Sequence, residues 1–109
     1  MLHVDKLTDI RHTIGDAAIY EQLAEECMEL AHACLKKARK LRGDNFTPKT
    51  FEEIDENLKE ELADVSLCIT VVNVMAFEDL LEIEYRENYK IDRWYERVCG
   101  ENNETERII

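Results

Sequence analysis

Glycine and proline are scarce in this chain, which has three glycines and one proline among 109 residues. So little turn-forming material argues against a fold of many short strands and tight turns, and it favours a few long helices. Aromatic residues make up only 7% of the sequence, whereas 45% of the residues are hydrophobic. A chain of this length can form one domain with its own core. We therefore expect an all-α protein.

Positive charge is also in short supply. The chain has 14 Lys and Arg residues against 25 Asp and Glu residues, for a formal net charge of -11. Nucleic-acid binding requires clustered cations that neutralise phosphates, so we expect no nucleic-acid partner. An acidic balance of this kind suits a bound cation, or it simply keeps the protein soluble.

Paired cysteines and long apolar runs are missing. The four cysteines form no CxxC pair, and no His/Cys spacing matches a zinc site. Cys27, Cys34 and Cys68 fall in apolar helical patterns, which predicts a reduced, cytoplasmic protein. The N-terminus has no apolar signal-peptide core. The most apolar stretch, 65–77, is too short and too polar to span a bilayer, so we expect no membrane association.

Hydrophobic periodicity predicts four helices, at about residues 4–13, 17–42, 50–77 and 79–98. Stretch 65–77 is apolar nearly all round, so it should be buried in the chain or in an oligomer interface. We expect a four-helix bundle with a long antiparallel hairpin, in an oligomer. The predicted boundaries are a single domain over 1–98 and a polar C-terminal tail over 99–109.

The helix ends carry recognisable signals. Asp16 is a candidate cap for the second helix, and Gly43 should end it. The third helix should start either at Thr47-Pro48 or at a capping box of Thr50 and Glu53. The apolar face of the second helix is predicted to consist of Ile19, Leu23, Cys27, Leu30, Cys34 and Leu41.

One acidic pattern occurs on both long helices. Leu23, Glu26, Glu29 and Leu30 are matched, 35 residues later, by Leu58, Glu61, Asp64 and Val65. At about 100° per residue, Glu26 and Glu61 lie at the same angle from their own apolar stripes. In an antiparallel hairpin both acidic pairs then flank one groove, and the midpoint between the pairs falls in the predicted turn. The sequence therefore predicts that these four carboxylates converge at one level.

Two readings of that convergence remain open. The carboxylates can splay into water as a solvated face of an acidic protein. Alternatively, because four carboxylates at one place repel strongly unless neutralised, they bind a cation. Oxygen ligands favour a hard ion, so Mg²⁺ is the first candidate and Mn²⁺ the second.

The same residues resemble a known family. An EExxE motif followed by ExxD on two adjacent helices is typical of the MazG-like, all-α NTP pyrophosphatases, and here it reads Glu25-Glu26-Cys27-Met28-Glu29 and Glu61-Leu62-Ala63-Asp64. The resemblance covers about residues 18–98, with a spacer slightly long for the family. It implies a Mg²⁺-dependent enzyme that hydrolyses nucleoside triphosphates to monophosphate and pyrophosphate, and that forms a homodimer or homotetramer.

The resemblance also implies roles for residues. Glu26, Glu29, Glu61 and Asp64 would be metal ligands, a metal-activated water would attack, and Glu25 would be a further catalytic acid that orients this water or a second metal. Lys90 and Arg93 would bind the triphosphate substrate. They belong to a basic series of one helix face that also includes Arg86 and Arg97. Lys90 stands where some relatives have Asn, and ordinary salt bridging is the alternative for the series.

Two other functions fit the same residues. The first is a catalytically silent helical adaptor that uses the acidic groove for metal-stabilised assembly. The second is a related enzyme that acts on a different, nucleotide-like diphosphate. A panel of nucleoside triphosphates separates the three, because the adaptor cleaves none and the related enzyme cleaves a non-nucleotide compound only. The sequence does not name the base or the sugar.

Overall fold

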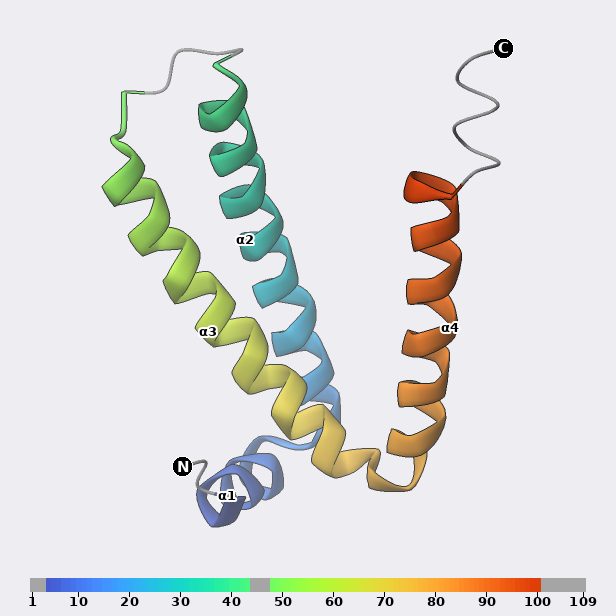
Figure 1. The fold of residues 1–109 in the computed structure, drawn as a ribbon. Helices are drawn as coiled ribbons and strands as arrows, with labels where there is room; N and C mark the ends of the chain where they lie inside the picture. The colour runs from blue at the N-terminus through green and yellow to red at the C-terminus, as the bar shows by residue number, and fades with distance from the viewer. Residues whose placement is uncertain (1–3, 44–47, 101–109) are drawn as a thin grey trace. The chain divides into compact units, whose positions relative to one another are not determined.

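The computed structural model describes residues 4–43 and 48–100, and within these residues the regular secondary structure is helical (Figure 1). The elements are α1 (Val4–Ile14), α2 (Asp16–Arg42), α3 (Phe51–Met75), the short 3₁₀ helix η1 (Phe77–Asp79) and α4 (Leu80–Cys99). The prediction of an all-α protein is confirmed. Among the described residues, no helix has the length and apolar character needed to cross a bilayer.

The chain divides into two compact units. Residues 1–75 form one, with α1, α2 and α3, and residues 76–109 form the other, with η1 and α4. The single domain over 1–98 stays a prediction. Of the predicted polar tail, Cys99 is the last residue of α4 and Gly100 follows it, while the remainder lies outside the described residues.

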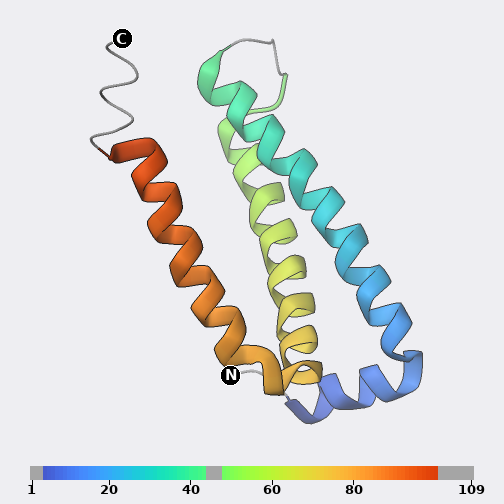
Figure 2. The ribbon, with the colours of Figure 1, turned by 90° about the vertical axis from the view of Figure 1, so that its right-hand side faces the viewer.

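In the first unit, α2 and α3 form the expected antiparallel hairpin, and α1 lies across the end at which α2 begins (Figures 1 and 2). Buried and half-buried residues recur every three or four positions along both helices, as they do when two helices pack along their lengths. We call these positions the hairpin seam. They are Ile19, Leu23, Glu26, Leu30 and Ala33 on α2, and Ile54, Leu58, Glu61, Val65 and Cys68 on α3.

Both ends of the hairpin are fixed by specific contacts. At the α1 end, Leu7, Ile19 and Val71 form a buried cluster from all three helices, against which Val72 and Met75 pack. At the other end, Lys37 Nζ pairs with Asp55 Oδ1 at 2.5 Å and stands 5.0 Å from the centre of the Phe51 ring. α2 and α3 are therefore tied together on both sides of their midpoint.

Glycine interrupts the helices where the sequence indicates. Gly15, with φ +88°, separates α1 from α2, and Gly43, with φ +71°, ends α2 in the left-handed conformation that favours glycine. The predicted cap by Asp16 is wrong, because Asp16 is already helical and its carboxylate accepts a hydrogen bond from Arg11 Nε at 2.8 Å. This contact holds the pKa of Asp16 below its ordinary value.

The start of α3 follows one of the two predicted signals. The Glu53 backbone N–H donates to Thr50 Oγ1 at 3.1 Å, the first half of a capping box, and the Thr50 hydroxyl lies 3.3 Å from Glu53 Oε1. Thr47 lies outside the described residues. At its other end α3 stops at Met75, two residues before the predicted end, and η1 follows after Ala76.

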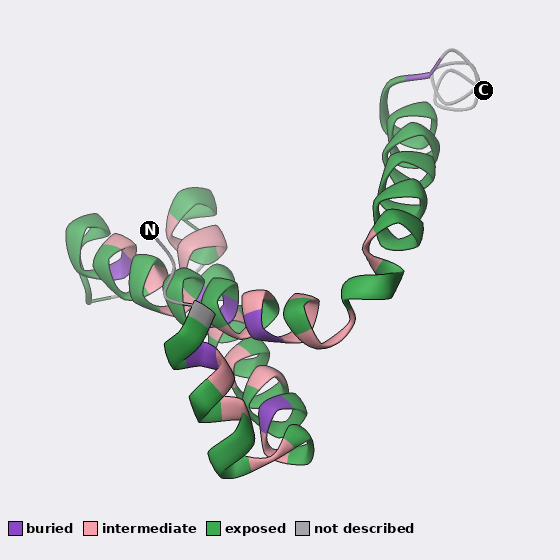
Figure 3. Ribbon diagram, turned by 90° about the horizontal axis from the view of Figure 1, so that it is seen from below, coloured by how far each residue is buried: buried purple, intermediate pink, exposed green. Residues whose placement is uncertain are grey.

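The predicted apolar face of α2 is only partly correct. Figure 3 shows how few positions of the chain are buried. Cys27 and Cys34 are exposed and Leu41 is 66% exposed, whereas Ala33, at 1%, is in the seam. On α3, stretch 65–77 is likewise not fully buried within the chain, since only Val65 and Val71 are. The hairpin thus buries one edge of a wide apolar surface and leaves the rest uncovered.

Candidate metal centre on the α2–α3 hairpin

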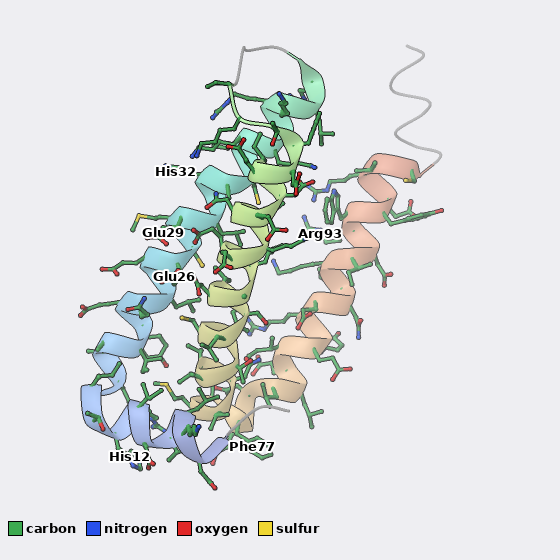
Figure 4. All side chains as sticks on the ribbon, turned by 90° about the vertical axis from the view of Figure 1, so that its left-hand side faces the viewer. His12, Glu26, Glu29, His32, Phe77 and Arg93 are labelled. Carbon is green, nitrogen blue, oxygen red and sulfur yellow. The ribbon has the colours of Figure 1, made fainter. Side chains whose placement is uncertain are left out.

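Four carboxylates meet on the hairpin. One oxygen each from Glu26, Glu29, Glu61 and Asp64 can be chosen so that all lie within 4.8 Å of one another. Figure 4 shows Glu26 and Glu29 on α2, one turn apart. The convergence predicted from the repeated sequence pattern is confirmed. It arises because both helices are continuous through this region and run antiparallel, so equivalent positions reach the same groove.

The four side chains form an inner and an outer pair. Glu26 and Glu61 are half-buried because each takes a seam position between apolar neighbours, Leu23 and Leu30 on α2 and Leu58 and Val65 on α3. Glu29 and Asp64 stand three residues later, about 60° further round their helices, and are exposed. The cluster therefore opens from the seam toward solvent.

One oxygen of each inner carboxylate lacks a hydrogen-bond partner. Glu26 Oε2 and Glu61 Oε2 are the buried side-chain oxygens of the described residues that have no hydrogen-bond donor. A buried acceptor without a donor is rare in folded proteins and costs stability. Burial raises the pKa of Glu26, and the charges of Glu29 and Asp64 raise it further, while a hydrogen bond from Gln22 opposes the rise. The seam thus contains carboxylate oxygens that a proton or a bound cation would neutralise.

The donor set fits a hard divalent ion. Four carboxylates supply oxygen ligands only, which Mg²⁺ and Mn²⁺ prefer. Cys68 lies beside the cluster, but burial, followed by the charges of Glu26, Asp64 and Cys27, raises the pKa of its thiol. A thiol kept protonated is a poor ligand for a soft metal. The grouped ligand residues do not include Cys68 and supply oxygen only.

The remaining predicted site residues lie outside this group of carboxylates. Glu25 is exposed and is not one of the four. Lys90 and Arg93 are exposed on α4, in the second unit, where the Arg93 guanidinium stands 5.8 Å from the centre of the Tyr89 ring. Arg86, in the same basic series, pairs with Glu82 at 2.6 Å, as the salt-bridging alternative anticipates. The roles of Glu25, Lys90 and Arg93 stay predictions.

Sequence analysis missed one residue of this region. Gln22 Nε2 donates to Glu26 Oε1 at 2.7 Å and so orients that carboxylate. Residues that form hydrogen bonds with metal ligands commonly orient those ligands in this way. The signal was present, because Gln22 precedes Glu26 by four residues and side chains at that spacing are neighbours on a helix.

In comparisons with family models, curated proteins and solved structures, no match to this chain was found. A function for it has to be inferred from its own geometry and chemistry.

The raised pKa of Glu26 predicts a dependence of stability on pH and metal. Without metal, the folded chain binds this proton more tightly than the unfolded chain does. The stability from the protonated form is complete below the ordinary pKa of 4.5 and is lost as the pH rises through the raised value. Mg²⁺ bound at the cluster would stabilise the ionised form, so we expect it to reverse the loss, by about 5–15 °C in melting temperature at a 100-fold excess over Kd.

The measurement is the melting temperature of the wild type minus that of Glu26→Gln, followed from about pH 4.5 to pH 8 with and without Mg²⁺. Taking this difference cancels the effect of the other acids, because they titrate in both proteins. Without metal it should become more negative as the pH rises, and Mg²⁺ should bring it back. A melting-temperature difference that changes with neither pH nor Mg²⁺ would show that Glu26 is an ordinary solvated carboxylate.

Proposed function

We propose that this protein is a Mg²⁺-dependent nucleoside triphosphate pyrophosphohydrolase, which converts an NTP or dNTP and water to the monophosphate and pyrophosphate. The observation that carries the proposal is the cluster of Glu26, Glu29, Glu61 and Asp64 within 4.8 Å, with two buried oxygens that have no donor. Such an arrangement is costly without a cation, and phosphate anhydride hydrolysis is a reaction that needs one. The resemblance to the MazG-like family supports the same assignment.

The reaction divides among the chain's own residues. Water adds to the α-phosphorus, the bond from that phosphorus to the bridging α–β oxygen breaks, and pyrophosphate leaves. Bound Mg²⁺, or Mn²⁺ in its place, would neutralise phosphate oxygens and lower the pKa of water. The four clustered carboxylates would hold the ion. Glu25 is the proposed acceptor of the water proton, since it is exposed beside Glu26 on the same helix.

Phosphates beyond the ion need cations. Lys90 and Arg93 are the proposed substrate-binding residues, because both are exposed on α4 and lie on one helix face by their spacing. Arg86 on the same helix is paired with Glu82. A point charge and a planar guanidinium three residues apart suit an extended polyphosphate.

We also propose that the protein works as a homodimer or homotetramer. Away from the seam, the hairpin exposes large apolar side chains that a monomer would leave in water. Leu62 is 49% exposed and Ile69 45%, and on α2 Met28 and Leu35 are 60% and 55% exposed. At about 100° per residue, Leu62 points about 160° away from Asp64. A second copy can therefore cover this face without blocking the metal centre.

A charge on that face should separate the copies. We expect Leu62→Arg to lower the mass of the particle in solution to that of one chain, 12.8 kDa, because an unpaired guanidinium in an apolar interface is strongly unfavourable. Light scattering after size exclusion gives the mass, and circular dichroism shows whether the helices persist. Glu60→Arg, at an exposed acidic position of the same helix, is the matched control and should leave the mass unchanged. A wild type that is already a monomer contradicts the proposal.

The function is tested with a panel of nucleoside and deoxynucleoside triphosphates, with pyrophosphate release measured in Mg²⁺ and in excess chelator. We expect Mg²⁺-dependent release, with monophosphate as the second product, from at least one member. Release of inorganic phosphate instead would place the bond cleavage elsewhere. Release from no member would overturn the proposal.

A further inference from the structure

An apolar pocket lies beside the proposed metal centre, within the first unit. It has a volume of about 240 Å³ and is formed where α1 crosses the start of α2 and the second half of α3. A pocket of this size, just below the range for drug-sized ligands, suits a single ring system. Its lining consists of six aliphatic side chains, one amide and one thiol, namely Leu7, Ile10, Ile14, Ile19, Gln22, Leu67, Cys68 and Val71.

Two lining residues also belong to the surroundings of the carboxylates. Gln22 donates its amide N–H to Glu26 at 2.7 Å, and Cys68 is close enough to Glu26 and Asp64 for their charges to act on its thiol. The pocket and the cluster are therefore adjacent. A molecule whose phosphates contact the proposed ion at the carboxylates could place a neighbouring group in the pocket.

The order of features along α2 matches the order of groups in a nucleoside triphosphate. Gln22 precedes Glu29 by seven residues and Lys36 follows it by seven, so the three lie within about 40° of one another on the helix face, with about 10 Å between successive members. Lys36 is half-buried, whereas the next cation, Lys37, is paired with Asp55. An apolar pocket, an acidic centre and a cation thus follow one another.

We propose that this pocket binds the base of the substrate, with the triphosphate extending over the carboxylates toward Lys36. The proposal rests on the proposed function and adds the binding site of the base and the direction of the substrate. The apolar walls select an uncharged planar ring. Because the Gln22 nitrogen donates one N–H to Glu26, its other N–H and its carbonyl oxygen remain for the edge of the base. Gln22 is therefore the specificity-determining residue, and it links the base to the orientation of Glu26.

Binding is tested without catalysis. Isoleucine methyl groups are labelled with ¹³C, and nucleosides without phosphate are added in the absence of metal. We expect shifts at Ile10, Ile14 and Ile19, with Ile54 and Ile69 unchanged as internal controls. No shift with any nucleoside, or shifts centred on Ile69, overturns the proposal. Shifts at the pocket that follow protein concentration and not nucleoside also overturn it, since they identify a second copy of the chain as the occupant.

A substitution that fills the pocket with a large side chain tests the same proposal by enzyme kinetics. Ile14 is 49% exposed, so Ile14→Trp can place an indole in the pocket without displacing the buried core. We expect KM for a nucleoside triphosphate to rise at least about 10-fold, the effect of losing one well-fitted apolar contact. Hydrolysis of methyl triphosphate, which has no base, should be unchanged. Thr13→Trp, at the exposed neighbouring position of α1, is the matched control.

The two proposals fail in different ways. If Ile14→Trp slows methyl triphosphate and the nucleotide equally, the pocket is not the site of the base. If the wild type cleaves neither compound, the proposed function fails, and the methyl shifts alone decide whether the pocket binds a base.

Discussion

Glu61→Gln should abolish pyrophosphate release, with a fall in kcat of about 10³-fold or more, because a lost metal ligand removes several kcal/mol of transition-state stabilisation. Glutamine has nearly the same volume, so the seam between Leu58 and Val65 stays filled and the helical signal should be retained. Asp64→Asn, in the outer pair, should have the same effect. Both follow from the convergence of these carboxylates with Glu26 and Glu29 within 4.8 Å.

Glu60→Gln is the matched control for this experiment. It removes the same charge from the adjacent residue of the same helix, but Glu60 is exposed and is not one of the four clustered carboxylates. It should keep wild-type activity. Full activity in Glu61→Gln, or an equal loss in Glu60→Gln, would show that the cluster is not the catalytic centre.

Glu26→Leu should stabilise the metal-free protein while it abolishes the response to metal. Glu26 occupies a seam position between Leu23 and Leu30, and its Oε2 atom is buried without a donor. A leucine continues the apolar packing and removes a repelling charge from the cluster, so we expect a rise in melting temperature on the order of 5 °C. Addition of Mg²⁺ should then produce no further rise.

Thermal melting with and without Mg²⁺ measures both effects. Glu21→Leu, an exposed acid on the same helix, is the control and should change neither the melting temperature nor the metal response. A Glu26→Leu protein less stable than the metal-free wild type would mean that the carboxylate already has a stabilising partner in the fold. If Glu26→Leu is more stable than the wild type, then Glu26 lowers the stability of the fold, as residues kept for function often do.

The sequence predicts the acidic cluster well for a simple physical reason. Both helices are uninterrupted, so a pattern repeated on them keeps its angle and its height once they pair antiparallel. Glu26 and Glu61 then come together, even though some of the apolar residues that complete the seam differ from the predicted ones. The end of α2 is equally predictable, because Gly43 adopts the left-handed conformation that favours glycine.

The choice of seam is harder to predict. The apolar surface of α2 extends from Leu23 past Cys27 to Met28, about 140° round the helix. Periodicity alone cannot tell which edge of so wide a surface meets α3. The fold selects the edge with the small Ala33, which is 1% exposed and lets the helices approach closely, and it leaves Cys27 and Cys34 exposed. In the proposed oligomer, those residues face a second copy.

The substrate-binding residues depend on information that one helix does not contain. Lys90 and Arg93 share a face by their spacing, yet α4 buries none of its own residues and belongs to the second unit. Helical spacing fixes which side chains lie together on α4, but not what they bind. The contact of Gln22 with Glu26, in contrast, can be predicted from the sequence, because Gln22 lies one helical turn before a predicted ligand.

Calorimetric titration with Mg²⁺ or Mn²⁺ tests the proposed metal centre most directly, since it requires neither substrate nor turnover. The wild type should bind at least one ion per chain, and the double variant Glu26→Gln/Glu61→Gln should bind none, while Glu60→Gln titrates like the wild type. Equal binding by the wild type and the double variant, or no binding by either, would contradict the account.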